Sequence, residues 1–124
     1  MNINIIKNKE YYRKKNDLCA CDMCKNYYLQ IEKEYPKIKE YLDNIGVDIL
    51  KPNELMWENE GEGIKYLNCE YVVLGKCEDD FEYIIDDIKI TKDKVHAPVN
   101  VSDEYFVLGL GVITLKNIID SNIN

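Results

Sequence analysis

The spacing of apolar residues changes once along this chain, and the change limits which folds the chain can form. Between residues 22 and 45 apolar side chains recur every three or four positions, as they do on one face of an α-helix. From residue 64 to residue 116 β-branched and aromatic residues form runs that are typical of strands. We therefore predict an α+β fold in which two N-terminal helices pack on an antiparallel sheet of three to four strands.

Proline and glycine mark the boundaries of these elements. Pro36 should end a first helix over residues 22–34 and start a second one, which Gly46 closes. The segment that follows is rich in Pro, Gly and acidic residues, and it indicates a loop that Trp57 attaches to the core. The three expected strands cover residues 64–74, 81–90 and 105–115, with a hairpin turn at residues 75–80.

A length of 124 residues fits one domain, which we assign to residues 1–124. Residues 1–16 are polar and basic, and they indicate an exposed lead-in or a short edge strand. Gly109 and Gly111 lie two positions apart in the last expected strand. Such a pair indicates that another part of the protein packs closely against the backbone, and we expect a helix there.

Three of the five cysteines, Cys19, Cys21 and Cys24, fall within six residues. Thiolates at this spacing can bind one soft metal ion, and a structural zinc ion would need a fourth ligand. The candidates for that ligand are Cys69, Cys77 and His96. We therefore expect either no cofactor or one zinc ion held by Cys19, Cys21 and Cys24.

Two other interpretations of the cysteine cluster stay open. Free cysteines are often buried, and Cys24 shares an apolar helix face with Tyr27 and Tyr28, so packing alone could explain it. The positive end of a helix also favours a thiolate, which would suit a redox or sensing thiol. The negative charges of Asp17 and Asp22 beside the cluster oppose that use.

The charge balance bears on the partners of the protein. Asp and Glu outnumber Lys and Arg by 23 to 16, a net charge of −7, which repels nucleic acid and anionic membrane surfaces. The same field favours docking of a basic protein. The candidate partner-binding residues are acidic residues of the second half: Glu58, Glu60, Glu62, Glu78, Asp79, Asp80, Asp86 and Asp87.

The residues give no indication of an enzyme. The single histidine, His96, has no recognisable nucleophile beside it, and the adjacent acids in the second half would point to opposite faces of a strand. The N-terminus lacks the apolar segment of a secretory signal, and no apolar run reaches the length of a membrane span. We therefore expect a cytoplasmic protein with reduced thiols.

The segment from the cysteine cluster into the second helix carries a resemblance to known proteins. It comprises Cys19-Ala20-Cys21-Asp22-Met23-Cys24-Lys25-Asn26-Tyr27-Tyr28, Pro36, Leu42, Gly46-Val47-Asp48 and Lys51-Pro52. This pattern is similar to the opening of small uncharacterised proteins from low-GC Gram-positive bacteria, which we associate with immunity genes that accompany polymorphic or contact-dependent toxins. The resemblance implies a cytoplasmic, non-catalytic protein that binds and blocks a cognate toxin domain.

A basic, nuclease-type toxin domain would fit the acidic composition of the chain, because an acidic surface could cover its active site and compete with its phosphate substrate. We therefore predict a toxin-neutralising immunity protein. The alternative is a small metal-binding or thiol-sensing protein centred on Cys19, Cys21 and Cys24.

Overall fold

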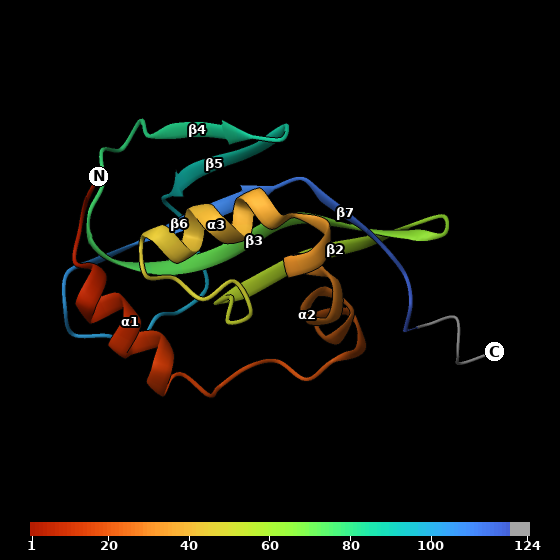
Figure 1. Ribbon diagram of the computed structural model, residues 1–124, viewed down its shortest axis with the longest axis horizontal. Helices are drawn as coiled ribbons and strands as arrows, with labels where there is room; N and C mark the ends of the chain where they lie inside the picture. The colour runs from red at the N-terminus through yellow and green to blue at the C-terminus, as the bar shows by residue number, and fades with distance from the viewer. Residues whose placement is uncertain (120–124) are drawn as a thin grey trace.

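The computed structural model describes residues 1–119, which form three helices and seven strands. In chain order these are β1 (Asn2–Ile3), α1 (Ile5–Lys14), α2 (Asp22–Glu34), α3 (Pro36–Asn44), β2 (Glu54–Glu60), β3 (Gly63–Lys76), β4 (Glu82–Ile85), β5 (Ile88–Asp93), β6 (Tyr105–Gly111) and β7 (Ile113–Lys116). Figure 1 shows α2 and α3 on one side of a curved antiparallel sheet. The α+β class is confirmed, whereas the expectation of two helices and three to four strands was wrong.

The predicted helical pair over residues 22–45 is present as α2 and α3. Tyr27 and Ile31 of α2 are fully buried and lie on one helix face. Pro36 occupies the first turn of α3, where its missing N–H costs no hydrogen bond, and Gly46 follows the helix at a φ of +81°. None of the helices within residues 1–119 is long and apolar enough to cross a membrane.

Helix α1 lies within residues 1–16, where the sequence indicated an exposed lead-in or a short edge strand. Only β1 matches that expectation. Asn8 of α1 is fully buried, donates to the Ile45 carbonyl at 3.0 Å and accepts from the Leu74 N–H at 2.7 Å. Tyr12 donates to the Val72 carbonyl at 2.6 Å. The helix is thus attached to the sheet by polar side chains, which a search for apolar periodicity does not detect.

Strand β3 organises the sheet. It pairs antiparallel with β1, β2, β6 and β7, while β5 extends the sheet beyond β6 and β4 forms the edge. Strands β3 and β4 are not paired, so the expected hairpin at residues 75–80 was wrong. Asp86 and Asp87, both at positive φ, instead form the tight turn from β4 to β5. Strand β2 was missed because only Leu55 is buried along it.

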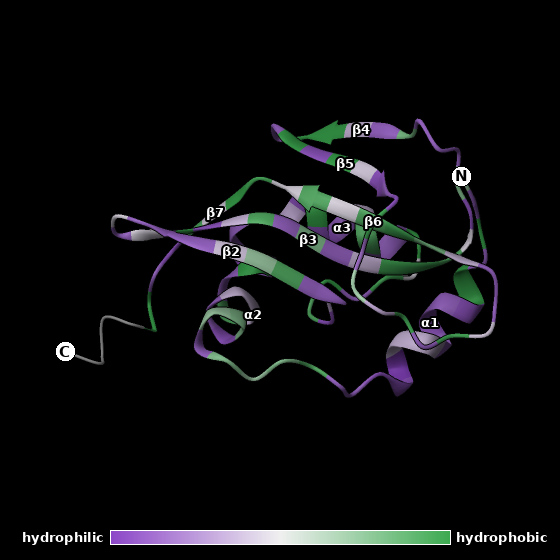
Figure 2. Cartoon of the chain, turned by 180° about the vertical axis from the view of Figure 1, so that it is seen from behind, coloured by the Kyte–Doolittle hydropathy of each residue, from purple (hydrophilic) through white to green (hydrophobic). Residues whose placement is uncertain are grey.

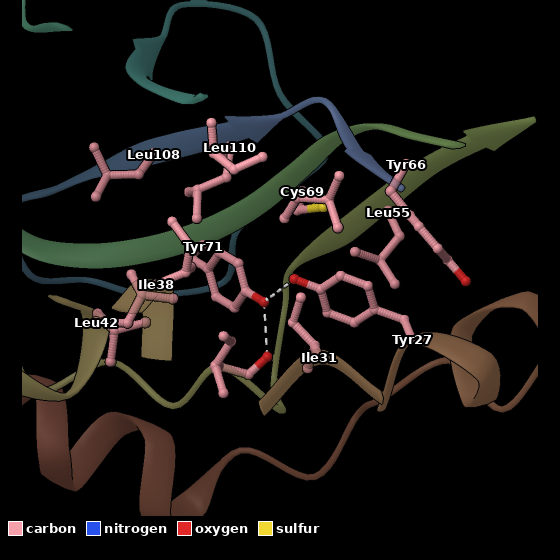
Figure 3. Packing of buried hydrophobic residues seen from close by; sticks show 14 of the residues in the cluster. Tyr27, Ile31, Ile38, Leu42, Leu55, Tyr66, Cys69, Tyr71, Leu108 and Leu110 are labelled. Carbon is pink, nitrogen blue, oxygen red and sulfur yellow. Dashed lines mark hydrogen bonds between the residues drawn. The ribbon is translucent and has the colours of Figure 1, made fainter. Parts of the chain in front are cut away.

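The core lies between the helices and the inner face of the sheet. In Figure 3 the rings of Tyr27 from α2 and Tyr71 from β3 point toward each other. Their hydroxyl oxygens lie 2.5 Å apart, and the Tyr71 hydroxyl also donates to the Ile49 carbonyl at 2.7 Å. A series of hydrogen bonds therefore crosses the core from α2 through β3 to Ile49.

The other face of the sheet carries polar side chains near its centre. Figure 2 shows this face, with β2, β3 and β6 in front of α3. Asn68 donates to the Asp93 carboxylate at 2.8 Å, and both side chains lie against Gly109, where a Cβ would collide with them. Gly111 lies against the backbone of Leu67. The close neighbours of the two glycines are thus side chains and a strand, and the expected helix was wrong.

Candidate metal centre

Cys19, Cys21 and Cys24 lie together at the start of α2. Their sulfur atoms are all within 4.8 Å of one another. Cys21 is the N-cap residue and Cys24 is the third residue of the helix, so the first helical turn brings these two thiols to the same side. The structure therefore gathers the three residues that the sequence indicates as metal ligands, and they could bind a metal ion.

Backbone N–H groups point at two of the sulfurs. The Cys24 N–H donates to Cys21 Sγ with an N···S distance of 3.4 Å, and the Cys21 N–H donates to Cys19 Sγ at 3.5 Å. Such donors stabilise negative charge on sulfur and form part of the outer shell of many metal–thiolate centres. The backbone at the start of α2 therefore favours anionic sulfur.

Two tyrosine hydroxyls fix the chain on either side of the helix start. Tyr28 donates to the Cys19 carbonyl at 2.9 Å, and Tyr66 of β3 donates to the Met23 carbonyl at 2.6 Å. Tyr66 is fully buried, so its hydrogen bond attaches the first turn of α2 to the sheet. The cysteine cluster consequently lies on a segment whose position the core determines.

The thiols of Cys21 and Cys24 differ in acidity. Partial burial opposes the Cys21 thiolate, but hydrogen bonds from the backbone and side chain of Cys24, from Cys19 and from the Met23 backbone outweigh it and lower the Cys21 pKa. Burial, together with the neighbouring sulfurs, raises the pKa of Cys24. A bound divalent cation would overcome this penalty, because a thiol that coordinates a metal is deprotonated.

The spacing of the sulfurs is close to that of a zinc site. Zn–S bonds of about 2.3 Å in a tetrahedral arrangement place sulfurs about 3.8 Å apart. The three sulfurs lie at most 4.8 Å from one another, so each would need to move closer to its neighbours by about 1 Å at most to bind one zinc ion. Rotation of the exposed Cys19 and Cys21 side chains can supply that movement.

The expected sources of a fourth ligand lie elsewhere. Cys69 is fully buried on β3, and Cys77 follows the C-terminal residue of that strand. His96 lies in the segment after β5 and packs against Tyr105. Within residues 1–119 no fourth His, Cys, Asp or Glu side chain joins the group of three. The three-cysteine set therefore stands alone in the described part of the chain.

The eight candidate partner-binding acids are all exposed but form three separate groups. Glu58, Glu60 and Glu62 lie on the β2–β3 hairpin, Glu78, Asp79 and Asp80 follow the opposite end of β3, and Asp86 and Asp87 form the β4–β5 turn. Because the 14 residues of β3 separate the first group from the second, these acids do not make one continuous surface.

Half of these acids already have a cationic partner. The ion pairs are Glu60–Lys65 at 2.7 Å, Glu78–Met1 N-terminus at 2.6 Å, Asp79–Lys92 at 2.7 Å and Asp86–Lys37 at 3.5 Å. Exposed pairs of this kind contribute little to stability, but they reduce the negative potential at their own groups.

Two apolar side chains on β2 were missed as candidates for a binding surface. Met56 is 57% exposed and Trp57 is 41% exposed, so Trp57 does not attach a loop to the core as expected. Both belong to the strand that carries Glu58 and Glu60. Large exposed aromatic and sulfur-containing side chains beside charged ones are typical of protein interfaces. The acidic residues on both sides of Trp57, the single tryptophan of the sequence, were the signal that could have indicated this surface.

The cysteine cluster and the β2–β3 hairpin are thus two candidate sites of this protein. Comparison with family models, with curated proteins and with solved structures finds no match for this chain.

Proposed function

We propose that this protein binds one zinc ion through the thiolates of Cys19, Cys21 and Cys24. The observation that carries the proposal is the gathering of the three sulfurs within 4.8 Å at the start of a helix whose inner face is buried. Thiolate ligands select soft or borderline ions, and zinc is the common one at cysteine sites.

The bound ion would connect an exposed segment to the core. Residues 15–21 join α1 to α2 and contain the exposed Cys19 and Cys21, whereas Cys24 belongs to the core cluster. Metal–thiolate bonds to all three would hold this connection against α2. Because an unfolded chain has no preformed site, the binding free energy would add to the stability of the fold.

Metal analysis of protein purified without chelator tests the proposal. We expect about one zinc per chain, lost in Cys21→Ser and kept in Cys77→Ser, which removes a cysteine outside the cluster. A wild-type protein that takes up no zinc after reduction and reconstitution would contradict it. A disulfide between two of the three cysteines in such metal-free protein would support the thiol-sensor alternative instead.

We propose toxin neutralisation as a second candidate function, favoured by the β2–β3 hairpin. Met56 and Trp57 are exposed there next to Glu58, Glu60 and Glu62. Met56, Glu58 and Glu60 lie on the same face of β2, whereas Trp57 lies on the opposite face. An exposed apolar side chain beside two acids would suit a basic protein surface such as that of a nuclease-type toxin domain in the cytoplasm. The resemblance of the N-terminal half to immunity-associated proteins supports the same role.

Co-expression with the protein encoded by the neighbouring gene tests this second function. We expect that protein to inhibit growth alone, and this chain to restore growth and to form a stoichiometric complex with it. Glu58→Lys with Glu62→Lys should weaken the complex more than about tenfold. The same charge change at Glu34 and Glu40 on the helices is the matched control and should have little effect. A neighbour that is neither toxic nor bound would contradict the proposal.

A further inference from the structure

The three thiols supply three of the four ligands that a tetrahedral metal ion takes. Cys24 is 5% exposed and forms the base of the cluster, whereas Cys19 and Cys21 are exposed. No further His, Cys, Asp or Glu of residues 1–119 joins them. A tetrahedral ion bound to these sulfurs would therefore have one position without a ligand from the described chain.

The number of protein ligands separates two kinds of zinc site. Sites with four protein ligands are closed and structural, whereas sites with three keep a position for water or an external molecule. The three thiols found within residues 1–119 match the second kind. Since two of its three sulfurs are on exposed residues, an external molecule can approach that position directly.

The charges around the open position act in opposite directions. The cluster lies at the N-terminus of α2, a helix of 13 residues whose first N–H groups and dipole attract negative charge. Asp22 in the first turn opposes this effect, while Asp17 is paired with Lys15 at 2.7 Å. A divalent ion bound by three thiolates carries one net negative charge, so charge does not select the fourth ligand. A thiolate is favoured because it matches the soft character of the three sulfur ligands.

We infer that the metal ion held by Cys19, Cys21 and Cys24 keeps its fourth coordination position open to solvent and binds an external thiolate there. This inference rests on the proposed metal-binding function. Binding is a ligand exchange in which the incoming thiol loses its proton to solvent and its sulfur replaces a bound water molecule. No electron transfer accompanies the exchange.

Cobalt substitution with 2-mercaptoethanol as the probe tests the inference. The reduced protein is loaded with Co²⁺ in a thiol-free phosphine reductant, and its visible and near-ultraviolet spectrum is recorded before and after the thiol is added. We expect tetrahedral d–d bands at the outset and, on addition, a saturable increase of about one third in the sulfur-to-cobalt charge-transfer band, as three thiolates become four. Imidazole, whose nitrogen is a less soft ligand than sulfur, should bind more weakly.

Several outcomes would overturn the inference. A four-thiolate spectrum before any thiol is added, reduced to three thiolates in Cys69→Ser or Cys77→Ser, would identify an internal fourth ligand. An unchanged three-thiolate spectrum at saturating thiol would show a closed site, and tighter binding of imidazole would show that the position does not prefer a sulfur ligand. Absence of d–d bands in the first spectrum would instead show that the metal-binding function itself fails.

Discussion

The hydroxyl oxygens of Tyr27 and Tyr71 lie 2.5 Å apart in the centre of the core, and both residues are fully buried. The proton of Tyr71 is directed to the Ile49 carbonyl, so Tyr27 is the donor to Tyr71. Burial raises the pKa of both tyrosines well above the usual value, so both stay protonated. This chain of hydrogen bonds links α2, β3 and the segment that follows α3.

The direction of the hydrogen bonds from Tyr27 to Tyr71 to Ile49 predicts that two conservative substitutions lower stability by unequal amounts. Tyr71→Phe leaves the buried Ile49 carbonyl without its donor and Tyr27 without its acceptor, which should cost about 1–3 kcal/mol. Tyr27→Phe removes only a donor and should cost about 0.5–1.5 kcal/mol. Denaturant unfolding of the two variants measures the difference. A larger loss of stability for Tyr27→Phe would contradict the assigned direction.

Asn8 should be the polar residue on which attachment of α1 most depends. Replacing it with alanine leaves the buried Leu74 N–H without an acceptor and the Ile45 carbonyl without its donor. We expect a loss of about 1–3 kcal/mol in the free energy of unfolding. Asn16→Ala, at an exposed position between α1 and α2, is the matched control. Equal stability of the two variants would contradict this role.

These contacts explain which parts of the fold could be predicted from the sequence. Helices α2 and α3 follow from apolar periodicity and from Pro36, which are local signals. Helix α1 could not be found in this way because its buried residues are Asn8 and Tyr12. The pairing of the strands also depends on contacts between distant segments, and only the structure shows that β3 pairs with β6 instead of β4.

The candidate sites also divide into features that depend on local sequence and features that depend on contacts between distant segments. Cys19, Cys21 and Cys24 are close in sequence, and one helical turn is enough to bring Cys21 and Cys24 together. The distance between the acids of the β2–β3 hairpin and those after β3 depends on the length of β3, and composition does not reveal that length. The exposure of Trp57 depends on the position of β2 in the sheet, and that position is set by pairing with β3.

Gly109 should be required by the side chains that lie over it. A Cβ at this position would collide with the carboxylate of Asp93 and the amide oxygen of Asn68. Gly109→Ala should therefore separate these side chains, break their hydrogen bond and cost about 1–3 kcal/mol. In an Asp93→Ala background the same substitution should cost less, because part of the obstruction is gone. Additive losses in this double-mutant cycle would contradict the explanation.

Alkylation of the metal-free protein should distinguish the cysteines by acidity and by position. Hydrogen bonds at the start of α2 lower the Cys21 pKa despite partial burial, whereas burial raises that of Cys77. A lower pKa means more thiolate, so as pH rises Cys21 should react with iodoacetamide at a lower pH than Cys77, as followed by peptide mass spectrometry. Zinc should slow alkylation of Cys21 at least about tenfold and leave Cys77 unaffected, because a coordinated thiolate is a poorer nucleophile. Equal protection of both cysteines would indicate general stabilisation of the fold, and no protection would exclude zinc from the cluster.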